Sequence, residues 1–397
     1  MNVLINAGKV VKGTGVDPIE KGAILIRDNK IAEVGQQGDV KAENGTEILD
    51  ARDKTVVPGL IDCHVHLCHT YQTWTHSKYM AQEITSSVLL GVSNAEQCIK
   101  SGVLTVRDLG CGHTGIFQLR SAINSGQIVG PRLLVCGQPI AMTGGHWWQM
   151  SQEADGPSEV RKAVRDQLRW GADCIKFMVT GGAGLQYEEI TEVQLNLDEL
   201  TAGVEEAKKK NKPVCAHVGN PEGALVCVEA GVDSIEHGTI LSEKALDAMK
   251  RAGSFYVPTL LCYWEIATKG KELGAREDNI RKARAIIDSH REAFQRAYRM
   301  GINIATGTDR VWGKIFVGES LISEMELMVK YGMAPMDAIK AATYTSACNL
   351  GIEKFAGTLE RGKLADLVIV EGDPLENMSN LRRVYRVMKE GKIVYEA

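Results

Sequence analysis

Eight short apolar runs between residues 59 and 309 constrain the fold of this chain more than any other feature. Each has the length of a β-strand, and longer segments with helical periodicity and Gly or Asn stops lie between them. Strands that alternate with helices pair in parallel, and eight such units predict an α/β fold, a closed (β/α)8 TIM barrel. The runs are GLIDCHVH (59–66), VLTVRDLG (103–110), PRLLVCG (131–137), ADCIKFMV (172–179), KPVCAHVG (212–219), VDSIEHG (232–238), SFYVPTL (254–260) and INIATGTD (302–309).

The alternative for such a pattern is an open, doubly wound sheet. That fold commonly has a glycine-rich phosphate-binding loop after its first strand. Here the first run ends instead in His64-Val65-His66. Residues two apart in a strand point to the same face, so both imidazoles leave the strand on one side and are placed to bind one metal ion.

The two ends of the chain have a different pattern. Residues 1–55 and the tail segments GTLERGKLADLVIVEGDPL and RVYRVMKEGKIVYE are strand-like and lack helix-length periodicity. Each half alone would leave an apolar face exposed, so we expect the two to form one small β-sandwich beside the barrel. The expected division is 1–58 and 355–397 for the sandwich and 59–354 for the barrel.

Charge and composition argue against several classes of partner. The net charge is −4, and the densest basic run, AKKKNK at 207–212, has the pattern of a solvated helix end, so we expect no nucleic-acid binding. No apolar run is long enough to span a bilayer, and the N-terminus lacks the pattern of a signal peptide. We therefore expect a cytoplasmic protein with no membrane partner, whose ten cysteines are reduced, mostly buried thiols.

Side chains that bind metals stand at the ends of five of the eight runs. In barrels of this kind, catalytic groups come from the carboxyl ends of the strands. Four imidazoles and an aspartate exceed the ligand set of one tetrahedral zinc ion, which predicts a pair of divalent metals. The candidates are His64, His66, Lys176, His217, His237 and Asp309, with Asp108, His146 and Tyr256 as weaker candidates at three further strand ends.

Lys176 is the best-placed group to bridge such a pair. Two divalent cations would repel an ammonium. A neutral amine can combine with CO2 to give a carbamate, an anion with one oxygen for each metal. We therefore expect N6-carboxylation of Lys176, and the alternative is that its side chain faces away or pairs with a carboxylate.

Taken together, these motifs resemble the amidohydrolase superfamily of metal-dependent hydrolases. PGLIDCHVHL, CIKFMVTGG, CAHVGN, IEHGT, TGTD and GTLERGKLADLVI cover nearly the whole chain in the expected order. The resemblance implies a barrel flanked by a sandwich, with two divalent ions, zinc being expected. It also implies that His64, His66 and Asp309 bind the first ion, that His217 and His237 bind the second, and that carboxylated Lys176 bridges them.

Within the superfamily the chain resembles the prolidase-like, arginine/lysine carboxypeptidase-like and ochratoxin-hydrolysing amidases. The segments that carry this likeness are ITEVQLNLDEL, TGGH and SFYVPTL. The likeness implies hydrolysis of an amide in a dipeptide or an N-acyl amino acid with release of the C-terminal residue, and it suggests a homo-oligomer. Trp147-Trp148 and Arg310 depart from the relatives and leave the exact substrate open.

The expected mechanism uses two metals to lower the pKa of a bridging water, which gives a hydroxide at neutral pH. Asp309 would take the proton and deliver it to the leaving amine. His146 could donate to the tetrahedral oxyanion, and Tyr256 could do so too or hold the substrate carboxylate. Arg310 is the best cation for that carboxylate, or else it closes a salt bridge, and Trp147 with Trp148 would form an apolar wall.

The remaining histidines are assigned lesser roles. We expect His69, His76 and His113 to lie behind the ligands or on the surface. His290, in a charged helical stretch, is expected to be solvated. Residues 264–299 are long, charged and helical, and could form a lid or an oligomer contact.

Three other functions remain open on the sequence alone. A deaminase or cyclic-amide hydrolase of the superfamily would act on a small ring, but His217 is not followed by the usual His-x-x-Glu pattern, because Glu222 is displaced. A lactonase or phosphotriesterase would share the two-metal ligand set. A non-catalytic, metal-stabilised scaffold would have no need of Asp309 as a general base.

Overall fold

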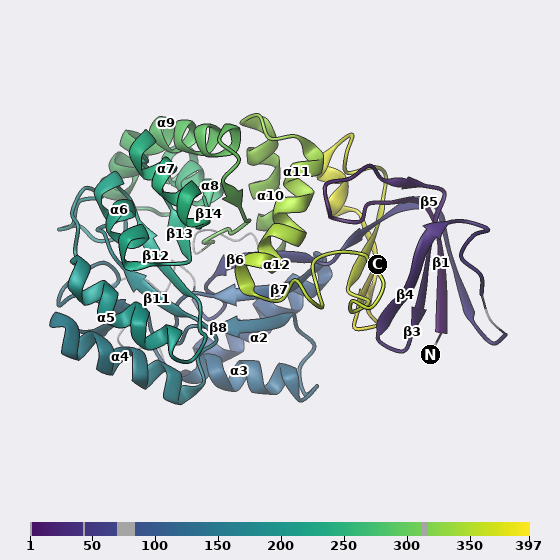
Figure 1. Cartoon of the computed structure of the whole chain (residues 1–397), viewed down its shortest axis with the longest axis horizontal. Helices are drawn as coiled ribbons and strands as arrows, with labels where there is room; N and C mark the ends of the chain where they lie inside the picture. Colours follow the sequence, from purple (N-terminus) through teal and green to yellow (C-terminus); the bar gives the residue numbers. More distant parts are fainter. Residues whose placement is uncertain (1, 43, 70–83, 311–316) are drawn as a thin grey trace.

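The computed structural model describes residues 2–42, 44–69, 84–310 and 317–397. It has two parts, which lie side by side in Figure 1: parallel strands surrounded by helices, and a sheet built from the ends of the chain. In the described ranges no helix has the length and apolarity needed to cross a membrane.

All eight expected runs contain a β-strand. The strands pair in parallel with their neighbours in chain order, within a sheet β6-β7-β8 and a sheet β10-β9-β11-β12-β13-β14-β15. The short strands β9 and β10 were not expected. The strands are β6 (Leu60–Val65), β7 (Val103–Asp108), β8 (Arg132–Val135), β9 (Ile140–Ala141), β10 (Gln152–Glu153), β11 (Ile175–Met178), β12 (Val214–Val218), β13 (Ser234–His237), β14 (Phe255–Val257) and β15 (Asn303–Ile304).

Backbone hydrogen bonds connect the two parallel sheets on both sides. The amide of Cys63 in β6 donates to the carbonyl of Thr306, just beyond β15, at 2.9 Å. The amide of Asp173, just before β11, donates to the carbonyl of Val135 in β8 at 2.8 Å. The carboxyl end of the first strand therefore lies beside the segment that follows the last strand, although the two are far apart in the sequence.

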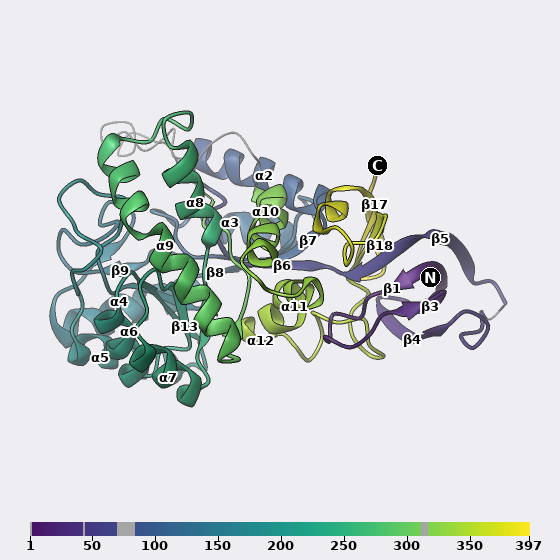
Figure 2. The same ribbon diagram turned by 90° about the horizontal axis from the view of Figure 1, so that it is seen from above.

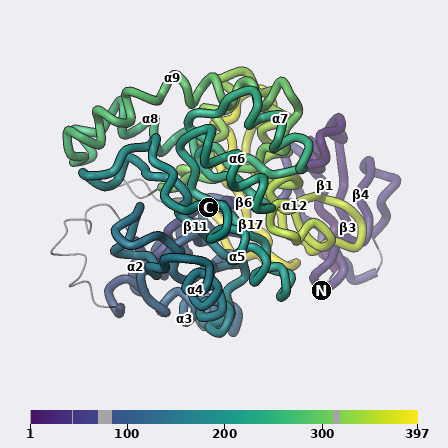
Figure 3. Tube along the Cα trace, turned by 60° about the vertical axis from the view of Figure 1, so that its left-hand side comes forward, coloured from purple at the N-terminus to yellow at the C-terminus, as the bar shows by residue number. Residues whose placement is uncertain are grey.

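The helices cover the outside of these strands and begin and end where local signals predict. Asn196 caps α5 in a capping box with Glu199, and Ser242 caps α7. Figures 1 and 3 show α8 and α9 on the opposite side of the strands from α3 and α4. The helices are α2 (Ile84–Lys100), α3 (Gly115–Asn124), α4 (Gly156–Trp170), α5 (Leu197–Lys208), α6 (Pro221–Ala230), α7 (Glu243–Ala252), α8 (Leu260–Lys269), α9 (Glu277–Arg299), α10 (Val317–Lys330), α11 (Pro335–Lys340), the π-helical turn η2 (Ala341–Thr345) and α12 (Ser346–Leu350).

Strands from both ends of the chain share one eight-stranded sheet, in the order β18-β17-β16-β5-β1-β3-β4 with β2 beside β1. Ile5, Ile24, Val56, Leu367 and Met388 form part of its buried core. Figure 2 shows β5 running from this sheet toward β6, where the parallel strands begin. The elements are β1 (Asn2–Val10), β2 (Ile19–Glu20), β3 (Gly22–Arg27), β4 (Lys30–Gln36), β5 (Glu47–Pro58), β16 (Leu367–Glu371), the 3-10 helix η3 (Met378–Arg382), β17 (Val384–Lys389) and β18 (Lys392–Glu396).

The cysteines match the expectation of buried thiols. All ten lie in the described parts of the chain, all are free, and only Cys348 is not fully buried. Cys136, Cys174 and Cys215 pack together with Leu109 in a small apolar cluster among the parallel strands.

Candidate active site

One cavity at the carboxyl ends of the parallel strands brings the predicted site residues together. Its empty volume is about 510 Å³, including the space open to solvent. The six predicted metal ligands and two of the predicted substrate contacts line it, although they come from widely separated places in the sequence. The lining residues are His64, His66, His146, Trp147, Lys176, Met178, Ala183, Gly184, His217, His237, Cys262, Tyr263, Ile266 and Asp309.

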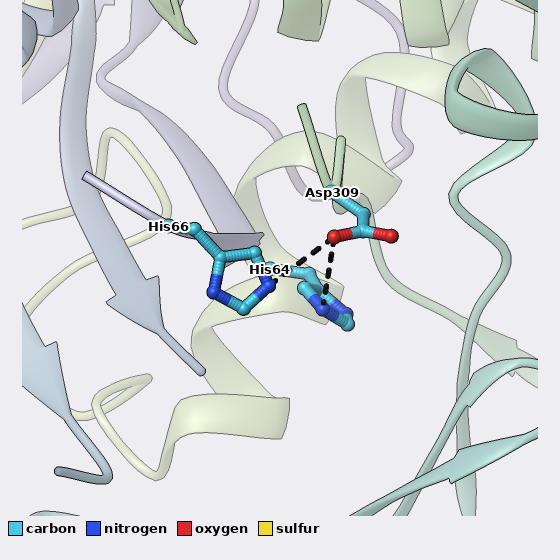
Figure 4. A group of neighbouring side chains, drawn as sticks. All are labelled: His64, His66 and Asp309. Carbon is cyan, nitrogen blue, oxygen red and sulfur yellow. Dashed lines mark ion pairs between the residues drawn. The ribbon is translucent and has the colours of Figure 1, made fainter. Parts of the chain in front are cut away.

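The tightest group in this cavity is His64, His66 and Asp309, which are drawn in Figure 4. The two histidines alternate with Val65 at the end of β6 and so point to the same side. The backbone amide of Asp309 donates to the carbonyl of His64 at 2.8 Å, which places its carboxylate beside both rings. Asp309 Oδ1 lies 3.2 Å from His66 Nε2 and 3.6 Å from His64 Nε2. These ligand atoms are close enough to share one metal ion.

Hydrogen bonds on the other ring nitrogen fix the orientation of three histidines. His64 Nδ1 lies 2.8 Å from Glu236 Oε2, His66 Nδ1 lies 3.0 Å from the Gly110 carbonyl, and His237 Nδ1 lies 2.7 Å from Thr259 Oγ1. In His64 and His66 this leaves Nε2 beside Asp309, as in most metal-binding histidines, whereas in His237 it is Nδ1 that lies 3.9 Å from Asp309 Oδ2. Burial lowers the pKa of His64 to about 4, so its ring is neutral, which is the form that binds a metal.

Behind His64, a buried ion pair holds the carboxylate that orients it. Arg107 donates from a guanidinium nitrogen to Glu236 Oε1 at 2.8 Å, and Ser234 Oγ donates to the same oxygen at 2.5 Å. Burial alone would raise the pKa of Glu236, but Arg107 and His64 outweigh it and hold this pKa at about 2. Glu236 is therefore ionised and accepts the Nδ1 proton of His64.

Replacing Glu236 with glutamine should weaken metal binding at His64. The new side chain has the same size, but its neutral amide is a poorer acceptor for His64 Nδ1 and leaves the buried Arg107 without its counter-charge. We expect the affinity for a metal ion at His64, His66 and Asp309 to fall by about tenfold to a hundredfold. Competition with a chelator, followed by metal analysis, measures this, and an unchanged affinity would contradict the orienting role.

Lys176 has the surroundings that a carboxylated lysine requires. Its side chain is 1% exposed and lines the cavity, and it makes no hydrogen bond or ion pair with any residue that the structure describes. A buried ammonium without a partner is costly. Burial lowers the pKa of His217 and of His237, which line the same cavity, well below its usual value. The carboxylation of Lys176 stays a prediction, and its buried, unpartnered side chain fits it.

Backbone strain is concentrated at this site. Asp309, His237, Thr259 and Trp147 all have positive φ angles, of 46°, 67°, 50° and 56°. Residues with a Cβ rarely adopt this conformation, and it persists only where the surroundings enforce it. Two of these residues are predicted metal ligands and Thr259 orients His237, so the strain coincides with the group of side chains that must be held in place.

Part of the cavity lining is apolar. Trp147 is 6% exposed and its ring lies 4.6 Å from that of His66. Met178 ends β11, the strand that carries Lys176, and the first turns of α8 add Tyr263 and Ile266. Cys262 and Tyr263 could not be predicted from the sequence, because they lie within a helix after the seventh strand and have no metal-ligand pattern around them.

His146 lies in the cavity as predicted, and an unexpected partner holds it. Its ring stacks on His217 with centroids 4.1 Å apart and planes 29° apart. Its Nδ1 lies 2.8 Å and 2.9 Å from the two carboxylate oxygens of Glu188. Glu188 lies in an irregular loop without periodicity, and so nothing in the sequence singled it out.

Three predicted substrate contacts do not line the cavity. Tyr256 is fully buried, and its hydroxyl donates to the Gly238 carbonyl at 3.2 Å. Arg310 is 4% exposed and pairs with Glu265 at 2.9 Å, which is the salt-bridge alternative considered for it. Trp148 is half-buried and is not among the lining residues.

The structure also places the remaining candidates. Asp108 is buried and accepts hydrogen bonds from the amides of Leu67 and Gly110, so it braces the loops around His66. His69 and His113 lie behind the ligands near Cys111, with 3.5 Å between Cys111 Sγ and His113 Nδ1. His76 lies outside the described residues.

The expectation that His290 is solvated is wrong. It is fully buried on α9, and its Nε2 lies 2.8 Å from the Pro258 carbonyl and 3.1 Å from the His237 carbonyl. Burial lowers the pKa of His290 to about 4, so the ring is neutral. Its ring also lies edge-on to Tyr263 at 5.5 Å. His290 thus supports the backbone at a predicted metal ligand.

Replacing Tyr256 with phenylalanine tests whether this residue takes part in the reaction. The change removes one buried hydrogen bond to Gly238 and should lower the free energy of unfolding by about 1 kcal/mol. We expect kcat and KM to stay within about twofold of wild type, because the cost falls on folding and not on the reaction. A large fall in kcat with an intact fold would restore Tyr256 as a catalytic residue.

The fold and the cavity agree with the family to which the sequence can be assigned. The chain belongs to the amidohydrolase family, which it matches over residues 55–394. Members of this family generally use divalent metals, and His64, His66 and Asp309 form a possible site for one. The protein is therefore a hydrolase of this superfamily.

Individual relatives identify the branch. Ochratoxinase from Aspergillus niger is 31% identical over 427 residues, which cover 98% of this chain and 86% of that protein. The crystal structure of A. niger ochratoxinase superposes with a TM-score of 0.90 at 30% identity, covering 100% of this chain and 96% of the other. A Xaa-Pro dipeptidase with methionine bound in its active site gives 0.91 at 35% identity over all of both chains. A prolidase complexed with N-methylphosphonate-L-proline gives 0.91 at 27% identity, again over all of both chains. The expected prolidase-like and ochratoxinase-like branch is confirmed.

Proposed function

We propose that this protein is a two-zinc amidohydrolase that cleaves an amide bond in a dipeptide or an N-acyl amino acid and releases the C-terminal residue. The observation that carries the proposal is the convergence of four histidines, a buried lysine and an aspartate on one cavity. Relatives named as an ochratoxinase and an Xaa-Pro dipeptidase support amide or peptide bonds as the target.

The scaffold we propose is a (β/α)8 barrel over residues 59–354, flanked by a β-sandwich of residues 1–58 and 355–397. The parallel strand order and the hydrogen bond between Cys63 and Thr306 support closure of the barrel. A cytoplasmic location and a homo-oligomer complete the proposal, as the resemblance to this branch suggests.

In the proposed metal centre, His64, His66 and Asp309 would hold one ion and His217 and His237 would hold the other. Lys176, as its N6-carboxylate, would serve as a ligand to both. Two bound divalent ions would supply an activated water at neutral pH and would polarise the scissile carbonyl.

Asp309 is the proposed proton carrier. Burial would raise the pKa of its carboxyl group, but His64 and His66 outweigh burial and hold that pKa below its usual range. The carboxylate is therefore ionised at neutral pH. One of its oxygens accepts the proton of the attacking water and passes it to the departing amine nitrogen.

The rest of the cavity is proposed to bind the substrate. Nε2 of His146 makes no hydrogen bond to any described residue, and it is placed to contact the oxygen that becomes negative during the reaction. Trp147, Tyr263 and Ile266 give the substrate an apolar surface, which favours a bulky or aromatic group.

A panel of dipeptides and N-acyl amino acids, assayed with added zinc and bicarbonate, tests the proposal. We expect release of the C-terminal residue from a subset with a large apolar side chain. Aminated heterocycles and lactones belong in the same panel. Turnover of these compounds and of no amide would reject the amidase in favour of a deaminase or a lactonase.

A further inference from the structure

The loop between β11 and α5 has internal contacts that hold Glu188 against His146. Both oxygens of Glu188 lie within 2.9 Å of His146 Nδ1, and one of them also accepts the amide of Leu185 at 2.8 Å. The side chain of Glu188 is 5% exposed. His146 lowers the pKa of Glu188 despite its burial, so the carboxylate is ionised and can only accept the Nδ1 proton. Nδ1 is therefore occupied, and Nε2 is the ring nitrogen left without a hydrogen bond to any described residue.

Close packing leaves His146 little freedom to turn. A Cβ at Gly182 would lie 2.4 Å from the nearest carbon of the His146 ring, so the loop backbone passes directly against the imidazole. The ring also stacks on His217. A shift of this loop would therefore move His146 relative to the metal ligands.

The first half of α9 holds the loop in this position. Lys282, which is 2% exposed, donates from Nζ to the Leu185 carbonyl at 2.8 Å and also to the carbonyl of Glu188 itself. Asn279, fully buried, donates to the carbonyl of Ala183. Arg276, just before the helix, donates to the Gly184 carbonyl at 3.0 Å. Four loop carbonyls thus accept hydrogen bonds from one short segment of the chain.

We propose that Glu188 is a positioning residue for His146, and that hydrogen bonds from Lys282 and Asn279 of α9, called the strap below, hold the 181–192 loop so that His146 Nε2 meets the substrate. The part of this proposal that concerns the substrate rests on the proposed hydrolysis. The part that concerns the hydrogen bonds between α9 and the loop depends on the fold alone. Glu188 acts through His146 and does not touch the reacting bond.

A double-mutant cycle tests the link between the two residues. Glu188→Ala should lower kcat by about tenfold to a hundredfold with the metal content unchanged, and Glu188→Gln, which retains an acceptor for Nδ1, should recover part of the loss. In a His146→Ala background, Glu188→Ala should cost about twofold or less, since its only route to the reaction is gone. A similar cost in both backgrounds would show a merely structural role and overturn the proposal. Glu189→Ala, the exposed neighbour, is the matched control and should leave kcat unchanged.

Hydrogen exchange tests the strap without any substrate. Lys282→Met keeps the apolar stem and removes the donors, so amide exchange in residues 181–192 should rise by about tenfold or more. Lys271→Met, at an exposed lysine just before α9, should change nothing there. Equal exchange in the two variants would overturn the strap. A wild type that cleaves no amide would reject the proposed function alone, because the exchange result stands without turnover.

Discussion

Replacing Asp309 with asparagine is expected to lower kcat by about 10²- to 10⁴-fold while the protein stays folded. Asparagine has nearly the same shape and can still accept the hydrogen bonds of the site. Its amide oxygen cannot take up a proton at neutral pH and return it to an amine. KM should change far less than kcat, because the loss falls on the transition state.

Asp247→Asn is the matched control, because Asp247 is exposed on α7 and far from the cavity in the fold. Metal analysis of both variants separates loss of a ligand from loss of the proton carrier. If Asp309→Asn retained wild-type kcat with its full metal content, Asp309 would not carry the proton.

Removing the Lys176 amine should lower activity about as much as Asp309→Asn does. The cause differs, because this change removes a proposed metal ligand and not the proton carrier. Lys176→Met keeps the apolar stem but cannot form a carbamate. We expect the metal content to fall from two ions per chain to one or fewer. kcat/KM should fall by at least about 10³-fold, because several kcal/mol of charge stabilisation are lost.

Lys176→Arg separates charge from carbamate chemistry, because it restores a cation that cannot be carboxylated at neutral pH. It should be as inactive as the methionine variant. Lys244→Met, exposed on α7, is the control. A carbon-13 NMR signal from labelled bicarbonate, present in wild type and absent in both variants, would identify the carbamate directly. Two ions bound in Lys176→Met would contradict the bridge.

The strand ends were predictable because their geometry follows from the alternation of strands and helices. Parallel strands in one layer present their carboxyl ends on one side. Residues as distant in sequence as His64 and Asp309 could therefore be expected to meet, and their side chains lie 3.6 Å apart. The same argument reached His217, His237 and Lys176, which line the same cavity.

Residues just beside the strand ends were harder to assign. Arg310 follows Asp309 directly, but the backbone of Asp309 has a positive φ angle, and the Arg310 side chain pairs with Glu265 of α8 instead of lining the cavity. Tyr256 lies on a three-residue strand, where its side chain enters the core against Gly238. Sequence position locates the end of a strand but does not give the direction of each side chain near it.

Contributions from irregular loops and distant helices left no sequence signal. Glu188 belongs to a loop without periodicity, and only the fold brings it to His146. The 264–299 segment was predicted to be helical and to form a lid or an oligomer contact. The structure places Lys282 and His290 of this segment against the backbone around the cavity. Both are buried polar residues on a highly charged helix, and their burial could not be read from composition.

Titration of metal-free protein with zinc, in the presence of bicarbonate and a cleaved dipeptide or N-acyl amino acid, tests the central claim most directly. The initial rate of release of the C-terminal residue is followed against the number of ions bound per chain. A two-metal amidohydrolase predicts that the rate rises to a plateau at about two zinc ions per chain. A plateau at one ion, or two bound ions with no amide cleavage, would contradict it.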